Sequence, residues 1–218
     1  MSFPVVIVLL GLVAGFLILR LRSVLGKRTG FERAPLPGQP GAAPISGKVI
    51  DGRAEPVASA PSRATPSQSS PLGQTLAQIG NMDSQFEPAH FLAGAEQAFR
   101  MIVTAFAAGD RPTLRGLLSD SVYATFEQAI SGRETAQEKQ RTEIKAVLGA
   151  SIEDAHLLGR HAAIIVKFVS DQVNVTTDPK GDIVAGTEAV TEIIDLWTFE
   201  RELGAADPVW RLAAARSG

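Results

Sequence analysis

The sequence predicts an α+β domain, with helices packed on one face of a curved antiparallel sheet, preceded by one transmembrane helix and a disordered linker. Residues 3–19 form an apolar run without charge, and a proline-rich stretch follows between residues 34 and 71. From residue 72 onward, apolar residues recur first at helical spacing and then in β-branched runs. Helices followed by antiparallel strands are typical of the α+β architecture.

The N-terminal run, FPVVIVLLGLVAGFLIL, has 17 residues, at the short end of the roughly 17–25 that span a bilayer. A cleaved signal peptide would need a basic N-terminal region and a small-residue cleavage site, but Met1 and Ser2 carry no side-chain charge and basic residues follow the run. We therefore expect an uncleaved anchor over residues 1–21. The basic C-terminal flank favours a single pass through the cytoplasmic membrane, with the N-terminus outside and the rest on the cytoplasmic side.

Charge divides the chain into two parts. Residues 1–71 hold 8 Lys and Arg against 3 Asp and Glu, whereas residues 72–218 hold 13 against 20, which gives net charges of +5 and −7. The basic residues expected to contact anionic lipid beside the anchor are Arg20, Arg22, Lys27, Arg28 and Arg33. Gly11 and Gly15 have the G-x-x-x-G spacing of packed membrane helices, so a homodimer is one candidate assembly.

Residues 22–71 are predicted to be a basic juxtamembrane stretch followed by a disordered linker. Between residues 34 and 71, 25 of 38 residues are Pro, Gly, Ser or Ala, and none is aromatic. This composition cannot bury enough apolar surface to offset the chain entropy lost on folding. We interpret the stretch as a spacer between the anchor and a folded domain over residues 72–218.

The first half of that domain is predicted to be helical. A weak amphipathic segment covers residues 72–79, and three helices follow, separated by a C-cap at Gly109 and an N-cap at Ser119 or Asp120. The apolar positions expected to face the core are Phe91, Ala95, Phe99, Ile102, Val103 and Phe106 in the first helix, Leu114, Leu117 and Leu118 in the second, and Val122, Phe126, Ala129 and Ile130 in the third.

The second half is predicted to form antiparallel strands. β-branched residues concentrate at 163–170, and the turn sequence DPKG at 178–181 separates two short strands at 173–177 and 183–185. Residues 145–155, 190–201 and 210–215 complete the expected sheet.

The sequence predicts no metal site, no cofactor and no nucleic-acid binding. It has no cysteine, no P-loop, no G-x-S-x-G motif and no dinucleotide fingerprint. None of the three histidines is followed by a second histidine or a glutamate at helical ligand spacing; they are His90, His156 and His161. The formal net charge of −2 disfavours a general nucleic-acid-binding protein.

The segments FLAGAEQAFRMIVTAFAAGDRPTLRGLLSDSVYATFEQAI, AAIIVKFVSDQVNVT, DLWTFER and DPVWRL resemble the Tim-type domain of the mitochondrial import inner membrane translocase subunit 44 family. The order of anchor, basic flank, spacer and domain is similar to that of its bacterial members. The resemblance implies a cone-shaped fold related to nuclear transport factor 2, with an apolar cavity between the helices and a concave sheet. It also implies an adaptor role at a membrane translocase.

By position, the resemblance further implies lipid contact through Leu72, Leu76, Ile79 and Phe86. The charge argues against this contact, because residues 72–86 contain Asp83 and no Lys or Arg, and the domain around them is acidic. An anionic membrane would repel such a surface.

We therefore expect a membrane-anchored, non-catalytic adaptor that binds a protein partner in protein translocation or envelope biogenesis. Two alternatives stay open, a domain that binds a lipid or small apolar ligand and, less favoured, an isomerase-like enzyme. The residues expected to line the cavity are Phe99, Phe106, Tyr123, Phe168, Asp195, Trp197, Phe199 and Trp210. In an enzyme, Asp195 would act as the base and Tyr123 as the acid. We favour an ion pair between Asp195 and Lys167 or Arg211.

Overall fold

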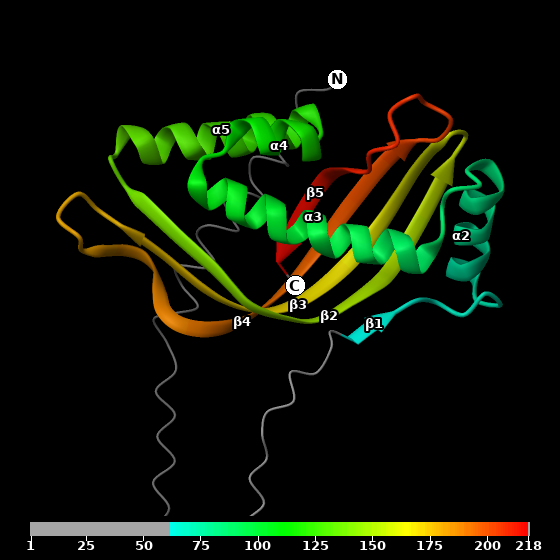
Figure 1. Cartoon of the computed structure of the whole chain (residues 1–218), viewed down its shortest axis with the longest axis horizontal. Helices are drawn as coiled ribbons and strands as arrows, with labels where there is room; N and C mark the ends of the chain where they lie inside the picture. The colour runs from blue at the N-terminus through cyan, green and yellow to red at the C-terminus, as the bar shows by residue number, and fades with distance from the viewer. Residues whose placement is uncertain (1–61, 218) are drawn as a thin grey trace, which may run out of the picture. The chain divides into compact units, whose positions relative to one another are not determined.

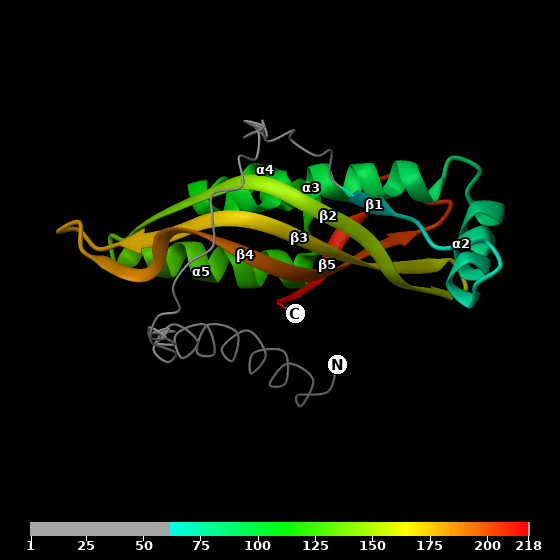
Figure 2. The same cartoon turned by 90° about the horizontal axis from the view of Figure 1, so that it is seen from below.

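The structure, a computed structural model, describes residues 62–217, which belong to one compact unit, Ala60–Gly218. In this part of the chain, four helices pack against a five-stranded mixed sheet (Figure 1). The expected α+β class is therefore confirmed. In the view from below, the long strands β2, β3 and β4 cross in front of α3 and α5, while α2 lies at one end of the sheet (Figure 2).

The helices begin and end where capping chemistry predicts. Glu87 caps α3 by accepting hydrogen bonds from two backbone amides, and Gly109 ends α3 in the left-handed region at φ 71°. Ser119 caps α5, as expected from the sequence. The helices are α2 (Pro71–Met82), α3 (Pro88–Ala108), α4 (Arg111–Leu117) and α5 (Asp120–Thr135).

The strands follow one another in the order β1-β2-β3-β4-β5. They are β1 (Ser62–Ala64), β2 (Lys139–Leu158), β3 (His161–Thr177), β4 (Ile183–Glu202) and β5 (Arg211–Ser217). Strands β2 to β5 pair antiparallel, whereas β1 pairs parallel with β2. The prediction of a purely antiparallel sheet is therefore wrong at this edge. Strand β1 also lies inside the segment expected to be linker, as does Pro71, the first residue of α2.

The two short strands predicted at 183–185 and 190–201 are one continuous strand. Gly186 has φ 79° and pairs with Val175, next to an irregular step in the β3–β4 pairing that falls between Thr187 and Thr191 of β4. A Cβ at Gly186 would clash with the backbone carbonyl of Asn174. Glycine therefore lets β4 bend and continue where the sequence pattern indicates a break.

The core lies between α3 and the face of the sheet that α3 covers. Three phenylalanine side chains are essentially inaccessible to solvent, namely Phe99, Phe168 and Phe199. The helical spacing predicts that Phe99 faces the core. One predicted inward position differs, because Ala129 of α5 is exposed. Tyr123 of the same helix is buried, and the Arg115 guanidinium lies over its ring at 3.7 Å from the centroid.

Residues 62–217 contain no helix that combines the length and the apolar character needed to cross a membrane. The anchor expected at residues 1–21 and the basic flank residues lie outside the described residues. The same holds for most of the expected linker.

Candidate functional site

An open aromatic groove lies between the first half of α3 and the chain segment that leads into β5. Its volume is about 310 Å³. The turn before α3, the end of α4 and the end of β4 also contribute to its walls. The lining residues are Gln85, Phe86, Glu87, His90, Phe91, Gly94, Ala95, Ala98, Leu117, Phe199, Arg201, Pro208, Val209 and Trp210.

Four aromatic rings form the apolar wall of this groove. Phe91 and Trp210 meet edge to face, with their ring centroids 5.0 Å apart, and Phe86 lies 5.8 Å from each of them. Phe199 supports Phe91 from below at 6.2 Å. Phe91 and Phe199 are buried, whereas Phe86 and Trp210 are half-buried and Val209 is 38% exposed. The groove therefore presents aromatic surface that the fold itself does not cover.

A nearly buried ion pair lies at the floor of the groove. The Arg201 Nη1 atom donates to Asp83 Oδ2 at 2.7 Å, and both side chains are 11% exposed. Asp83 also accepts a hydrogen bond from the Gln85 amide, which orders the turn that carries Phe86. The Nε atom of Arg201 is buried and makes no hydrogen bond within residues 62–217. Arg201 therefore leaves one donor unsatisfied next to an apolar groove.

Glu87 fixes one rim of the groove. Its carboxylate accepts hydrogen bonds from the backbone amides of Ala89 at 3.0 Å and His90 at 2.6 Å. These two hydrogen bonds favour the ionised form and lower the pKa of Glu87 below its ordinary value, although the side chain is open to solvent.

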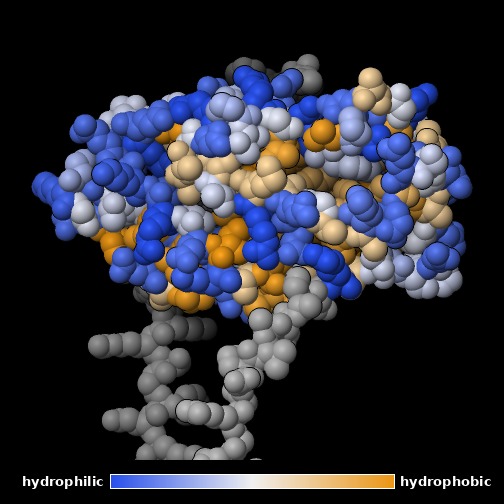
Figure 3. Space-filling view, viewed as in Figure 1, coloured by the Kyte–Doolittle hydropathy of each residue, from blue (hydrophilic) through white to orange (hydrophobic). Residues whose placement is uncertain are grey.

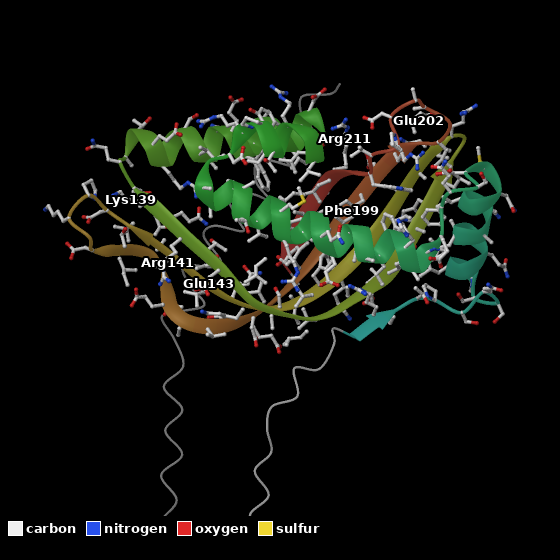
Figure 4. The ribbon with its side chains drawn as sticks, viewed as in Figure 1. Lys139, Arg141, Glu143, Phe199, Glu202 and Arg211 are labelled. Carbon is white, nitrogen blue, oxygen red and sulfur yellow. The ribbon has the colours of Figure 1, made fainter. Side chains whose placement is uncertain are left out.

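Asp207 orders the loop that carries the lining residues Val209 and Trp210. It accepts the backbone N–H of Val209 at 3.0 Å and a hydrogen bond from Arg211 at 2.6 Å, and these contacts lower the pKa of Asp207. Arg211 also donates to the Gly116 carbonyl at 2.7 Å, so the loop that carries Trp210 is tied to α4. Figure 4 places Arg211 near α4 and Phe199 on β4 in the same part of the molecule.

The structure separates the predicted cavity residues into groups that do not share one site. Phe99 stacks on Phe168 at 4.6 Å and touches Trp197 at 4.8 Å, and these three rings are buried in the core. Phe199 and Trp210 line the groove.

Phe106 lies near the C-terminal end of α3, away from the groove lining. Its ring lies 4.7 Å from that of Phe126 and beneath the Arg133 guanidinium. Arg133 also donates to the Phe106 carbonyl at 2.6 Å. This contact satisfies one of the last carbonyls of α3, so Phe106 and Arg133 stabilise the helix end.

The proposed acid and base are not part of the groove. Tyr123 is buried beneath Arg115, and Asp195 is half-buried on β4 opposite Phe168. Lys167 pairs with Leu196 in the sheet, so it faces the side opposite Asp195, and it lies 3.4 Å from Glu153. Arg211 is occupied by Asp207.

The apolar face of α2, which the resemblance assigned to lipid contact, packs inside the domain. Leu76 and Ile79 are buried in the core, and Leu72 packs against it. Phe86 belongs to the groove. Leu76 and Ile79 cannot insert into a bilayer while α2 stays packed on the domain.

Two of the histidines lie beside carboxylates. His156 is 3.2 Å from Asp154, and His161 lies 3.4 Å from Glu200 and 3.9 Å from Glu202. Among the described residues, no group of three or more His, Asp or Glu side chains could hold a metal ion.

Sequence reasoning missed Phe91 and Arg201 as groove residues and assigned Phe86 to a lipid surface. The signal available was the adjacency of aromatic and basic residues in WTFER and DPVWRL. It could not show that these segments meet the turn before α3.

The apolar surface on one face of the domain forms separate patches. On the face shown in Figure 3, the orange hydrophobic patches are bordered by blue hydrophilic residues. The fold and its open aromatic groove thus define a class of protein, an α+β binding domain on a helix-covered sheet.

Residues 72–217 match the Tim44-like domain, so the chain belongs to the Tim44-like family, as the sequence motifs predicted. Members of this family are generally non-catalytic.

The chain has distant similarity to proteins from several sources. The chain is 23% identical over 145 residues to the mitochondrial import inner membrane translocase subunit TIM44-1 of Arabidopsis thaliana, and the match covers 63% of this chain and 31% of that protein. Among solved structures, the intermembrane space region of the chloroplast protein ARC6 has a TM-score of 0.44 at 8% identity, covering 58% of this chain and 95% of that chain. A conserved protein from Planctomyces limnophilus has a TM-score of 0.34 at 16% identity, covering 57% and 94%.

Proposed function

We propose that this protein is a membrane-anchored, non-catalytic adaptor whose groove binds an apolar segment of a protein partner. The observation that carries the proposal is the half-exposed pair Phe86 and Trp210, which the fold holds at the mouth of an open groove. Clustered aromatic rings in a pocket are the commonest anchors of protein interfaces.

The floor of the groove favours a polypeptide over a hydrocarbon chain. A peptide carries a carbonyl on every residue, and a small shift of Arg201 would let its free Nε donate to one of them. An acyl chain has no acceptor to offer at this depth.

Charge favours a partner segment with basic flanks. Glu87 lines the groove, Asp207 directly precedes the lining residues Pro208 and Val209, and residues 72–218 carry a net charge of −7. Such a domain repels anionic lipid and attracts a basic segment. The cone shape expected from the resemblance, with its cavity, would be the frame that holds this groove.

A role in protein translocation across or into a membrane is part of the proposal. It rests on membership in the Tim44-like family and on the name of the distant relative, an import translocase subunit. The expected anchor at residues 1–21 would hold the domain on the cytoplasmic side of the membrane. The linker would let the domain reach protein partners near that membrane.

Site-specific photo-crosslinking in membranes tests this function. A benzophenone side chain is placed at Val209 on the groove rim or, as a matched control, at Val190, which is 56% exposed outside the groove. We expect a protein adduct from position 209 that maps to an apolar segment with basic flanks and that Trp210→Ala removes. Adducts to phospholipid alone, or equal protein adducts from both positions, would contradict the proposal.

A further inference from the structure

Strand β1 is a very short strand at the edge of a long one. Residues Ser62–Ala64 pair parallel with Gly149–Ser151 of β2, which itself spans 20 residues. Pro61 precedes β1 and Pro66 follows it closely, and proline has no backbone N–H to donate. The two prolines therefore limit the backbone hydrogen bonds that the chain could add at the ends of β1.

One side chain of β1 adds an ion pair to these few backbone contacts. The Nε and Nη2 atoms of Arg63 lie 3.1 and 2.9 Å from Oε2 of Glu96, which belongs to α3. Glu96 is 5% exposed and is the only fully buried charged residue among those the structure describes. Arg100, one turn along α3, holds its other oxygen at 3.2 Å. Glu96 therefore places a buried carboxylate beside this edge of the sheet. This carboxylate favours a strand that carries a basic side chain at the position of Arg63.

The edge of β2 next to β1 is uncharged, and the pairing of β2 with β3 has an irregular step at Leu148, between Val147 and Gly149. Leu148, immediately before the paired residues, is 42% exposed, and the stretch 148–151 contains no charge. Farther along, Lys139, Arg141 and Glu143 project from the distant end of β2 (Figure 4), where charged side chains discourage strand pairing. The uncharged part of the edge is therefore the part that β1 occupies.

We propose that β1 is a replaceable occupant of a strand-addition site, and that the partner is an extended segment with an arginine or lysine at the position of Arg63. The partner strand runs parallel to β2 and has no proline at the position of Pro61. Such a strand has a backbone N–H to donate at the position of Pro61, beside the irregular step at Leu148, whereas the chain's own segment has none. Its basic side chain takes the place of Arg63 on Glu96. This inference does not depend on the groove.

The state of β1 is tested first, by hydrogen exchange of the full-length protein in detergent micelles. Arg63→Ala is expected to raise the exchange rates of the amides of residues 62–64 and 149–151 by about tenfold or more, because β1 then detaches. Arg100→Ala is the matched control, since it removes the other cation of Glu96 without touching β1, and it should leave these amides protected. Equal rates in both variants would overturn the proposal.

Peptide binding then tests the partner. The probe is a dye-labelled peptide, Thr-Val-Thr-Ser-Arg-Ala-Thr, and its control carries Glu in place of Arg. By fluorescence anisotropy, the Arg peptide should bind Arg63→Ala protein at least about fivefold more tightly than wild type, because the chain's own strand no longer competes. Glu96→Gln should abolish the preference for Arg over Glu. If the two peptides bind alike, or if Arg63→Ala leaves the affinity unchanged, the proposal is wrong.

Discussion

The domain contains two aromatic clusters that differ in what covers them. Phe99, Phe168 and Trp197 lie under the middle of α3 and are closed on every side, with exposures of 0, 0 and 5%. Phe86 and Trp210 lie where α3 begins, and they stay half-exposed because only the rim loops flank them. The same kind of side chain therefore stabilises the fold in one place and leaves surface for binding in the other.

Truncation in the closed cluster should have the largest effect on stability. Phe168→Ala removes a ring stacked on Phe99 and is expected to lower the free energy of unfolding by about 3–5 kcal/mol, as for other buried Phe residues. Urea denaturation followed by circular dichroism measures the loss. Leu158→Ala, at an 83% exposed position, is the control and should be close to wild type. A loss below about 1 kcal/mol for Phe168→Ala would show that the cluster is not closed.

The second-largest loss of stability is expected when the ion pair between Arg201 and Asp83 is broken. Arg201→Met leaves Asp83 nearly buried without its cation, and we expect a loss of about 2–4 kcal/mol in the same denaturation experiment. The double variant Arg201→Met/Asp83→Leu should recover part of that loss, because no uncompensated charge remains. If the double variant is less stable than the single one, the pair does more than neutralise charge.

Truncation in the open cluster should cost less stability. Trp210 is half-buried, so Trp210→Ala is expected to lower the free energy of unfolding by about 1–2 kcal/mol. A loss as large as that of Phe168→Ala would place Trp210 in the core and remove the distinction between the two clusters.

Acidification is expected to have the smallest effect on stability, and that effect should be confined to the segments around Glu87 and Asp207. The folded pKa values of Glu87 and Asp207 are lowered, so both carboxylates stabilise these segments above the ordinary pKa values of 4.5 and 3.8. That contribution is lost as the pH falls below these values and through the lowered folded pKa values. Amide exchange at His90 and Val209 should therefore accelerate on acidification relative to amides in the middle of α3. In Glu87→Gln, the His90 amide should lose this pH dependence, and an unchanged profile would contradict the assignment.

The helices were predictable from the sequence because apolar spacing and capping residues are local signals. Gly109 and Ser119 stand at the boundaries they predicted. The strands were predictable as segments but not as lengths, because Gly186 carries β4 through a bend that resembles a turn in sequence.

The candidate site was predictable only in part. Phe199 and Trp210 were expected to line a cavity, and they line the groove, but Phe168 and Trp197 from the same prediction lie in the core. Whether an aromatic side chain is buried depends on where α3 crosses the sheet. That position cannot be read from the type of residue. Strand β1 was missed because three residues in a Pro- and Ser-rich stretch carry no pattern of their own.

The central claim is that the open cluster binds an apolar segment with basic flanks. It is tested most directly by the affinity of the full-length protein in neutral detergent micelles for a dye-labelled Leu/Phe/Ala peptide flanked by lysines. Trp210→Ala should weaken binding by at least about tenfold, as loss of an aromatic anchor does, whereas the matched control Val190→Ala should leave it unchanged. Equal affinities for wild type, Trp210→Ala and Val190→Ala would contradict the account.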